Sequence, residues 1–217
     1  MSPLRLLVPV LILAASLPVS AQRTISDARI TYKVEMPPEQ LQMEAMFAGS
    51  SMTQYIRGNL SRVDMNFNVV NYIYLINSQQ EHVITLMDNH GDKYLIRTDK
   101  KTYEADVKRF ASIQFADQSE TREIAGYKCR KTIGTMADGA TFEVFYTTDI
   151  VPENPYYNRR FQNLKGIPLE YEILTKSGSK MRAIATNVDL SPVPASIFDV
   201  PKGYREITAE ELKKIRG

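Results

Sequence analysis

The sequence is poor in residues that cross-link a chain or bind metals. It contains one cysteine, Cys129, in 217 residues, so an internal disulfide is excluded and stability must come from the core. Cys129 shares strand parity with Tyr127 and Ile133, which favours a small buried side chain over a reactive or intermolecular thiol. Tryptophan is absent, but the 12 tyrosines are typical of a β-rich chain, because aromatic side chains fit a pleated surface.

Catalytic motifs are also missing. The sequence has no G-x-S-x-G nucleophile motif, no Walker motif and no dinucleotide-binding glycine motif. Asp88, His90 and Asp92 alternate as metal ligands can, but a structural zinc site needs about four ligands and the only other histidine is His82. Asn, Gly and Asp are the residues of a tight turn, which is the better interpretation of this segment. We therefore expect no enzyme, no metal site and no cofactor.

Neither a strong charge nor a long apolar run marks the chain after its first 21 residues. Arg5 lies within these 21 residues, so the rest of the chain carries 26 basic and 25 acidic residues. This balance does not indicate a nucleic-acid partner and gives no strong attraction to an anionic membrane. No later segment approaches the roughly 20 apolar residues needed to span a bilayer.

Residues 1–21 have the pattern of a secretory signal peptide. A short basic start is followed by the apolar run Leu6–Ala15 and by the small residues Val19-Ser20-Ala21. The run is about half as long as a membrane span, so removal is favoured over anchoring. Cleavage after Ala21 places Gln22, and no lipid-bearing cysteine, at the new terminus. We expect residues 22–217 to form a single domain that is exported, soluble, periplasmic or secreted, and not a lipoprotein.

Period-two alternation of apolar and polar residues dominates the rest of the sequence. One face of the first predicted strand carries Ala28, Ile30, Tyr32, Val34 and Met36. The pattern returns at residues 63–69, 142–146 and 167–173, and it places Glu170 and Glu172 on a solvated face. Turn residues, Asp99-Lys100 among them, separate the strands at short intervals and require antiparallel neighbours. We expect an α+β, mainly β fold: a single curled antiparallel meander of about ten strands, forming an unclosed half-barrel.

Two segments have helical character. Pro37-Pro38 can open a helix at about residues 38–48, after the first strand, and Gly49 is suited to end it. Thr208 and Glu211 form a capping box for a short C-terminal helix that ends near Arg216. The longest irregular stretch, residues 149–163, is rich in aromatic residues and is a candidate lid loop with Tyr156, Tyr157 and Phe161.

A cluster of methionines is the feature with the clearest functional implication. Methionine is flexible and polarisable, and it recurs on surfaces that accept varied apolar partners. The candidate hydrophobic-ligand residues in and around the first helix are Met36, Leu41, Met43, Met46, Phe47, Met52, Met65 and Phe67. They form either an apolar groove under the helix or a sealed core between helix and sheet, and the sequence leaves both alternatives open.

Six segments in this order resemble an exported family of unknown function that is common in Bacteroidetes. They are Ile30–Met36, Tyr55–Met65, Glu123–Cys129, Tyr146–Asp149, Lys165–Tyr171 and Phe198–Tyr204. Gly166-Ile167-Pro168-Leu169 partly matches the motif of the related GLPGLI-type family. The closing Phe-x-x-Pro-x-Gly-Tyr pattern and the order of strands and helix also resemble the lipoprotein-localisation carriers of the LolA and LolB type. That resemblance implies an unclosed antiparallel barrel that shields an acyl chain beneath helices.

These observations favour a non-enzymatic binding protein of the periplasm or cell envelope. Its ligand would be a lipid, an acyl chain or an apolar peptide held in the half-barrel. The alternative is a structural or interaction module of the envelope, with a filled core, no ligand and an envelope protein as partner. An enzyme with an unrecognised site is a third, weaker hypothesis, which a cluster of titratable side chains in a cavity would favour.

Overall fold

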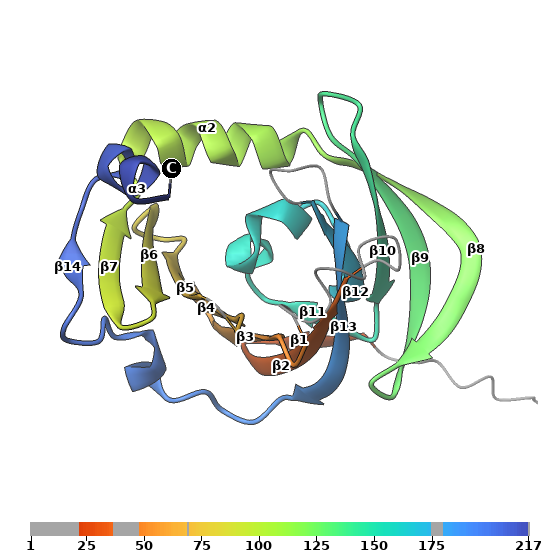
Figure 1. Ribbon diagram of the computed structural model, residues 1–217. Helices are drawn as coiled ribbons and strands as arrows, with labels where there is room; N and C mark the ends of the chain where they lie inside the picture. Colours follow the sequence, from red (N-terminus) through yellow and green to blue (C-terminus); the bar gives the residue numbers. More distant parts are fainter. Residues whose placement is uncertain (1–21, 37–47, 69, 175–179, 217) are drawn as a thin grey trace, which may run out of the picture.

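The computed structural model describes residues 22–36, 48–68, 70–174 and 180–216. One twelve-stranded sheet dominates this part of the chain and curls into an open half-barrel (Figure 1). The predicted fold class is therefore confirmed, with twelve strands in place of about ten. The expected leader and the helix expected at about residues 38–48 lie outside the described residues.

The first half of the sheet is an antiparallel meander joined by short turns. Its strands are β2 (Asp27–Glu35), β3 (Ser51–Arg57), β4 (Leu60–Asn66), β5 (Asn71–Asn77), β6 (His82–Asn89) and β7 (Asp92–Arg97). His90 and Gly91 have positive φ angles of 52° and 96° in the turn between β6 and β7. The Asp88 carboxylate accepts a hydrogen bond from the Gly91 backbone N–H at 2.8 Å. This segment is thus the tight turn that its composition predicts.

The helix α2 (Lys100–Ala111) leads the chain away from β7 to the opposite edge of the sheet (Figure 1). The strands β8 (Gln114–Ile124), β9 (Tyr127–Thr135), β10 (Thr141–Thr147), β12 (Ile167–Leu174) and β13 (Lys180–Asp189) then return antiparallel until β13 pairs with β2. The sheet is thus two meanders that meet at β2 and β13, and the prediction of one continuous meander was wrong.

The difference from the prediction begins at Asp99, where a helix starts in place of a hairpin. The Asp99 carboxylate accepts hydrogen bonds from the backbone N–H and the hydroxyl of Thr102, at 2.9 and 2.8 Å. This is the geometry of a helix N-cap, so Asp99-Lys100 begins a helix and is not the hairpin turn that we expected. Asp, Asn and Ser serve both turns and N-caps, and composition alone does not separate the two.

The C-terminal segment crosses the outer face of the first meander. It contains η4 (Ala195–Phe198), the short edge strand β14 (Arg205–Glu206), which runs parallel to β7, and α3 (Ala209–Arg216). Arg62 of β4 donates a hydrogen bond to the Ile197 carbonyl at 2.6 Å and thereby fixes the crossing. The predicted capping box is confirmed, because the Glu211 backbone N–H donates to the Thr208 hydroxyl at 3.1 Å. None of the described helices is long and apolar enough to cross a membrane.

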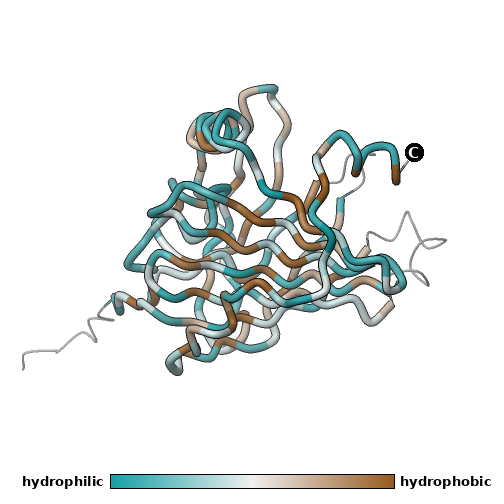
Figure 2. Tube along the Cα trace, turned by 90° about the vertical axis from the view of Figure 1, so that its left-hand side faces the viewer, coloured by the Kyte–Doolittle hydropathy of each residue, from teal (hydrophilic) through white to brown (hydrophobic). Residues whose placement is uncertain are grey.

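The predicted strand alternation is confirmed on the concave face, which carries most of the core. Apolar positions lie side by side on neighbouring strands (Figure 2). Cys129 is fully buried in this core, and burial raises the pKa of its thiol to about 12. A smaller cluster on the outer face lies near the C-terminal segment and consists of Leu75, Ile84, Leu86 and Leu95, with Tyr204 packed against it.

A separate pair of strands lies beside the large sheet. β1 (Arg23–Ile25) runs parallel to β11 (Ile150–Pro152), with Ile25 opposite Pro152. Ile25 and Ile150 are buried in the main core. This pair anchors the start of the irregular segment 149–163, so the segment leaves the sheet from a fixed point.

Candidate functional site

The predicted ligand residues that the structure describes lie on or beside the concave face. Met52 and Phe67 are buried in the main core, whereas Met36 and Met65 are half-buried and pack against it. Leu41, Met43, Met46 and Phe47, which belong to the expected helix, lie outside the described residues. The structure therefore brings Met52 and Met65 together, opposite each other on β3 and β4.

Met52 and Met65 belong to a longer row of side chains that crosses six strands. Register places one residue from each of β2 to β7 directly opposite the next. The members of this methionine–tyrosine row are Tyr32, Met52, Met65, Tyr72, Met87 and Tyr94. Strands lie about 4.8 Å apart, so the row is roughly 24 Å long. Alternation in the sequence indicates the face of each residue, but the row itself depends on strand register.

A pocket of about 410 Å³ opens where β2 ends and β3 begins. Its lining includes Val34, Met36, Gly49 and Ser50. The Ser50 hydroxyl is buried and has no hydrogen-bond partner among the described residues. The pocket adjoins the concave face, because Val34 follows Tyr32 on the same side of β2. Its volume falls in the range of small-molecule sites.

The irregular segment 149–163 enters the curl of the sheet beneath α2 (Figure 1). It forms two short turns, η2 (Pro155–Tyr157) and η3 (Arg159–Phe161). Tyr157 and Phe161 are buried, whereas Tyr156 is 49% exposed. The Phe161 ring meets the Tyr171 ring edge-on at 4.9 Å between centroids. The segment thus fills part of the concavity, and its action as a lid stays a prediction.

Three buried tyrosines supply polar groups inside this core. Tyr32 donates a hydrogen bond to the Pro168 carbonyl at 2.9 Å, and the Tyr171 hydroxyl lies 3.5 Å from the Met52 sulfur. The Tyr157 hydroxyl is buried without a partner in the described part of the chain. Burial raises the pKa of all three hydroxyls above the ordinary value for tyrosine, so each stays protonated and can donate.

The outer face of β12 carries two carboxylates that are buried, contrary to the sequence-based expectation. Glu170 and Glu172 were expected on a solvated face, but they are only 4% and 9% exposed. Glu170 accepts hydrogen bonds from Arg122 at 3.0 Å and Arg182 at 2.7 Å, and Glu172 accepts one from Lys180 at 2.9 Å. The long basic side chains cover the carboxylates and neutralise them. Strand alternation identifies the face but carries no information about such cover.

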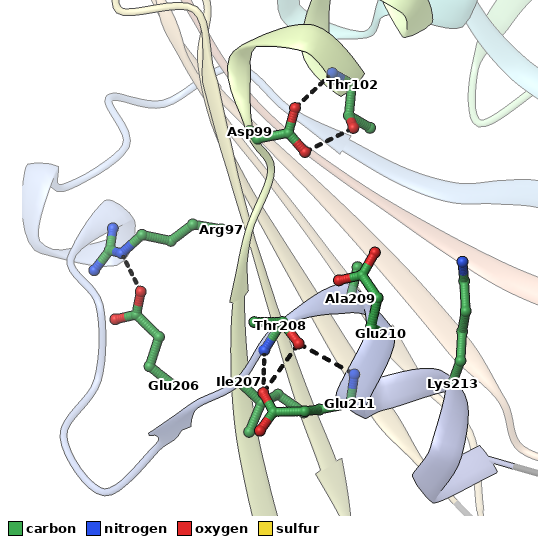
Figure 3. A pocket seen from close by; sticks show the side chains of 10 residues that line it. All are labelled: Arg97, Asp99, Thr102, Glu206, Ile207, Thr208, Ala209, Glu210, Glu211 and Lys213. Carbon is green, nitrogen blue, oxygen red and sulfur yellow. Dashed lines mark hydrogen bonds and ion pairs between the residues drawn. The ribbon is translucent and has the colours of Figure 1, made fainter.

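A second pocket, of about 560 Å³, lies between α3 and the start of α2 (Figure 3). Several of its polar side chains are paired with one another, for example Arg97 with Glu206 at 3.2 Å. Asp99 and Glu211 cap their own helices. These groups serve the local structure, so the concave face is the stronger candidate site. Within the described segments, no group of three or more His, Cys, Asp or Glu residues could hold a metal ion.

Comparison with known proteins gives similarity in fold only. No protein-family model matches the sequence, and no curated protein matches it. A solved structure of PNGF-II aligns with 88% of this chain at a TM-score of 0.51 and 17% identity, and a second crystal form aligns with 87% at 0.50 and 18%. This chain spans about one third of the length of PNGF-II, 33% and 32% in the two forms.

Two further solved structures are more distant. An uncharacterized conserved protein from Thermus thermophilus has a TM-score of 0.48 at 10% identity, over 87% of this chain and 92% of its own. The MucA/MucB complex of Pseudomonas aeruginosa contains a chain with a TM-score of 0.42 at 13% identity, over 81% of this chain and 56% of its own. The unclosed antiparallel half-barrel implied by the resemblance to lipoprotein-localisation carriers is observed in the structure itself, whereas membership of a Bacteroidetes or GLPGLI-type family stays a prediction.

Proposed function

We propose that this protein is a non-enzymatic binding protein of the periplasm or cell envelope that holds a hydrophobic ligand against the concave face. The observation that carries the proposal is the methionine–tyrosine row. At roughly 24 Å, the row exceeds the roughly 15 Å that the acyl chains of one bilayer leaflet span. Methionine side chains adapt to irregular apolar shapes, and tyrosines combine an apolar ring with a polar tip. A lipid or acyl chain suits such a wall.

The export pattern of residues 1–21 supports the location, and the arrangement of charges supports a non-catalytic role. The buried carboxylates Glu170 and Glu172 are held in ion pairs on the outer face, opposite the methionine–tyrosine row. N-terminal sequencing of the exported protein tests the location. We expect Gln22 as the first residue and no attached lipid, and acylated protein or a retained leader would contradict this.

Two variants on opposite faces of the sheet test the ligand site. Met65 of β4 is half-buried on the concave face, whereas Ile73 of β5 is half-buried on the outer face. We expect Met65→Asp to abolish uptake of a fluorescent fatty acid while the circular dichroism spectrum remains that of the folded protein. Ile73→Asp introduces the same charge and should leave uptake unchanged. A folded Met65→Asp protein that binds as well as the wild type would refute the placement.

The second candidate function is an envelope interaction module without a small ligand. The observation in its favour is that Tyr157 and Phe161 already occupy part of the curl. Native mass spectrometry of protein purified from its own envelope separates the two functions. Co-purified lipid supports the binding protein, whereas a ligand-free protein that also fails to bind fatty acid in vitro supports the module.

A further inference from the structure

In the part of the chain that the structure describes, buried hydrogen-bond donors without partners are concentrated in one short segment. Six buried side-chain nitrogen or oxygen atoms lack a partner within the described segments, and four of them belong to residues 157–162. They are the Tyr157 hydroxyl, Arg159 Nη1, Arg160 Nη2 and Gln162 Nε2. All four atoms can donate, and residues 155–162 contain no acidic side chain. The segment therefore brings donors and positive charge into the half-barrel without matching acceptors.

Two aromatic rings hold the guanidinium of Arg160 in place. The guanidinium carbon lies 4.0 Å from the centroid of the Phe142 ring and 5.7 Å from that of Phe161. Phe142 can lie across β9 only because residue 134 is glycine: a Cβ at Gly134 would come within 2.4 Å of the ring. Phe115 meets the Phe142 ring edge-on, with 6.1 Å between centroids. Stacking on aromatic faces fixes the plane of an arginine and leaves the N–H groups at its edge available.

The acidic groups near these two arginines either lie too far away for a close ion pair or already accept hydrogen bonds from other residues. Asp106 approaches Arg159 only at 4.0 Å. Glu172 lies in the electrostatic field of Arg160 but accepts hydrogen bonds from Lys180 at 2.9 Å and from the Glu143 backbone N–H at 3.0 Å. Burial lowers the pKa of Arg160 to about 10, so its side chain is still charged at neutral pH. A buried cation without an anion is unfavourable, and such groups are usually paired.

We propose that Arg160, together with the hydroxyls of Tyr157 and Tyr171, receives the acidic group of an amphiphilic ligand, a carboxylate or a phosphate. The tail would then lie along the methionine–tyrosine row, because the Tyr171 hydroxyl contacts Met52, the second member of that row. An arginine fork matches both kinds of oxyanion. This inference rests on the proposed function, since it assigns a polar end to the same hydrophobic ligand.

The test compares three ligands that share one saturated chain and differ only at the end group. A fatty acid, an alkyl phosphate and a fatty alcohol each displace a fluorescent fatty acid from the wild type, from Arg160→Met and from the control Arg130→Met. Arg130 is an arginine on β9 whose side chain is 55% exposed. We expect the wild type to bind the better acidic ligand about 10- to 100-fold more tightly than the alcohol, the range for a charge-assisted hydrogen bond. The acidic ligand with the larger gain in affinity over the alcohol shows whether the site prefers a carboxylate or a phosphate.

Arg160→Met should lose this advantage and keep the affinity for the alcohol, whereas Arg130→Met should behave as the wild type. Without ligand, Arg160→Met should also melt at a higher temperature, because an unpaired buried charge has been removed. A purely structural arginine would give the opposite shift in melting temperature and no change in end-group preference, which would overturn the proposal. Equal affinities of the wild type for all three ligands would overturn it too, while leaving the hydrophobic site intact.

Tyr157→Phe keeps the inference testable if Arg160→Met does not fold. It removes a hydroxyl that has no hydrogen-bond partner among the described residues, and it preserves the buried ring. We expect the ratio of acid to alcohol affinity to fall several-fold with the alcohol affinity unchanged. An unchanged ratio in every folded variant overturns the proposed role of this cluster. Failure of the wild type to bind any of the three ligands refutes the proposed function itself, which is a distinguishable outcome.

Discussion

Replacement of Phe161 by alanine tests whether the irregular segment 149–163 belongs to the core of the half-barrel. Phe161 is 1% exposed, and its ring lies 4.9 Å from that of Tyr171 and 6.5 Å from that of Phe115. Truncation of a buried phenylalanine removes its burial energy and leaves a cavity, which costs about 3–5 kcal/mol. A domain of this kind has a total stability of about 5–15 kcal/mol, so the loss is a large fraction of it.

Urea unfolding followed by circular dichroism measures the change. With a slope of about 2–3 kcal/mol per molar urea, Phe161→Ala should lower the midpoint by about 1–2 M. Tyr156→Ala is the matched control in the same segment, because its side chain is 49% exposed. A surface truncation of this kind should change stability by no more than about 0.5 kcal/mol. Equal midpoints for the two variants would refute the placement of Phe161 in the core.

Three further predictions concern charged and titratable groups. Glu170→Gln should destabilise the fold by about 1–3 kcal/mol, since two partly exposed arginines lose their buried acceptor, whereas Glu206→Gln, in an exposed ion pair, should cost less than about 1 kcal/mol in the same urea assay. Lys131 donates to Glu143 at 2.7 Å and holds the pKa of that carboxyl below its ordinary value near 4.5. The native state therefore binds fewer protons there than the unfolded state. The resulting stabilisation is present above pH 4.5 and is lost as the pH falls through the folded pKa, so Glu143→Gln should flatten the acid side of the stability–pH curve. Cys129, whose pKa is raised to about 12, should not react with a thiol reagent at pH 8 until urea unfolds the protein, and fast labelling of the native state would contradict its burial.

The predicted architecture follows from a strong local signal. Period-two alternation indicates which face of a strand is buried, and that information is local to each strand. Tyr32 and Met52 therefore fall on the concave face as expected. The order of strands is a different kind of information, because it depends on where the chain leaves one edge and joins another. At Asp99, which the sequence does not distinguish from a turn, the chain begins the helix α2 that connects the two meanders.

The interior site escapes sequence reasoning for a related reason. Arg160 lies in an irregular segment that has no periodic pattern. Its guanidinium stacks on the ring of Phe142 on β10, and that ring has room only because residue 134 on β9 is glycine. These residues are brought together by strand register and by the path of the segment through the curl. The sequence indicates that residues 149–163 are unusual, but composition does not show that two arginines enter the core with them.

The two functional hypotheses, filled core and open groove, differ in what they expect along the concave face. Near β12 and β13, Phe161 and Tyr157 pack into the curl and leave these strands covered. Toward β4, Met65 remains half-buried on the same face of the sheet. A ligand lying along the methionine–tyrosine row would therefore meet a fixed wall of buried rings at one end and adaptable side chains along its length. A wall of this composition restricts the end group of a ligand more strongly than its tail, so we expect selectivity for the head of an amphiphile and tolerance of its chain length.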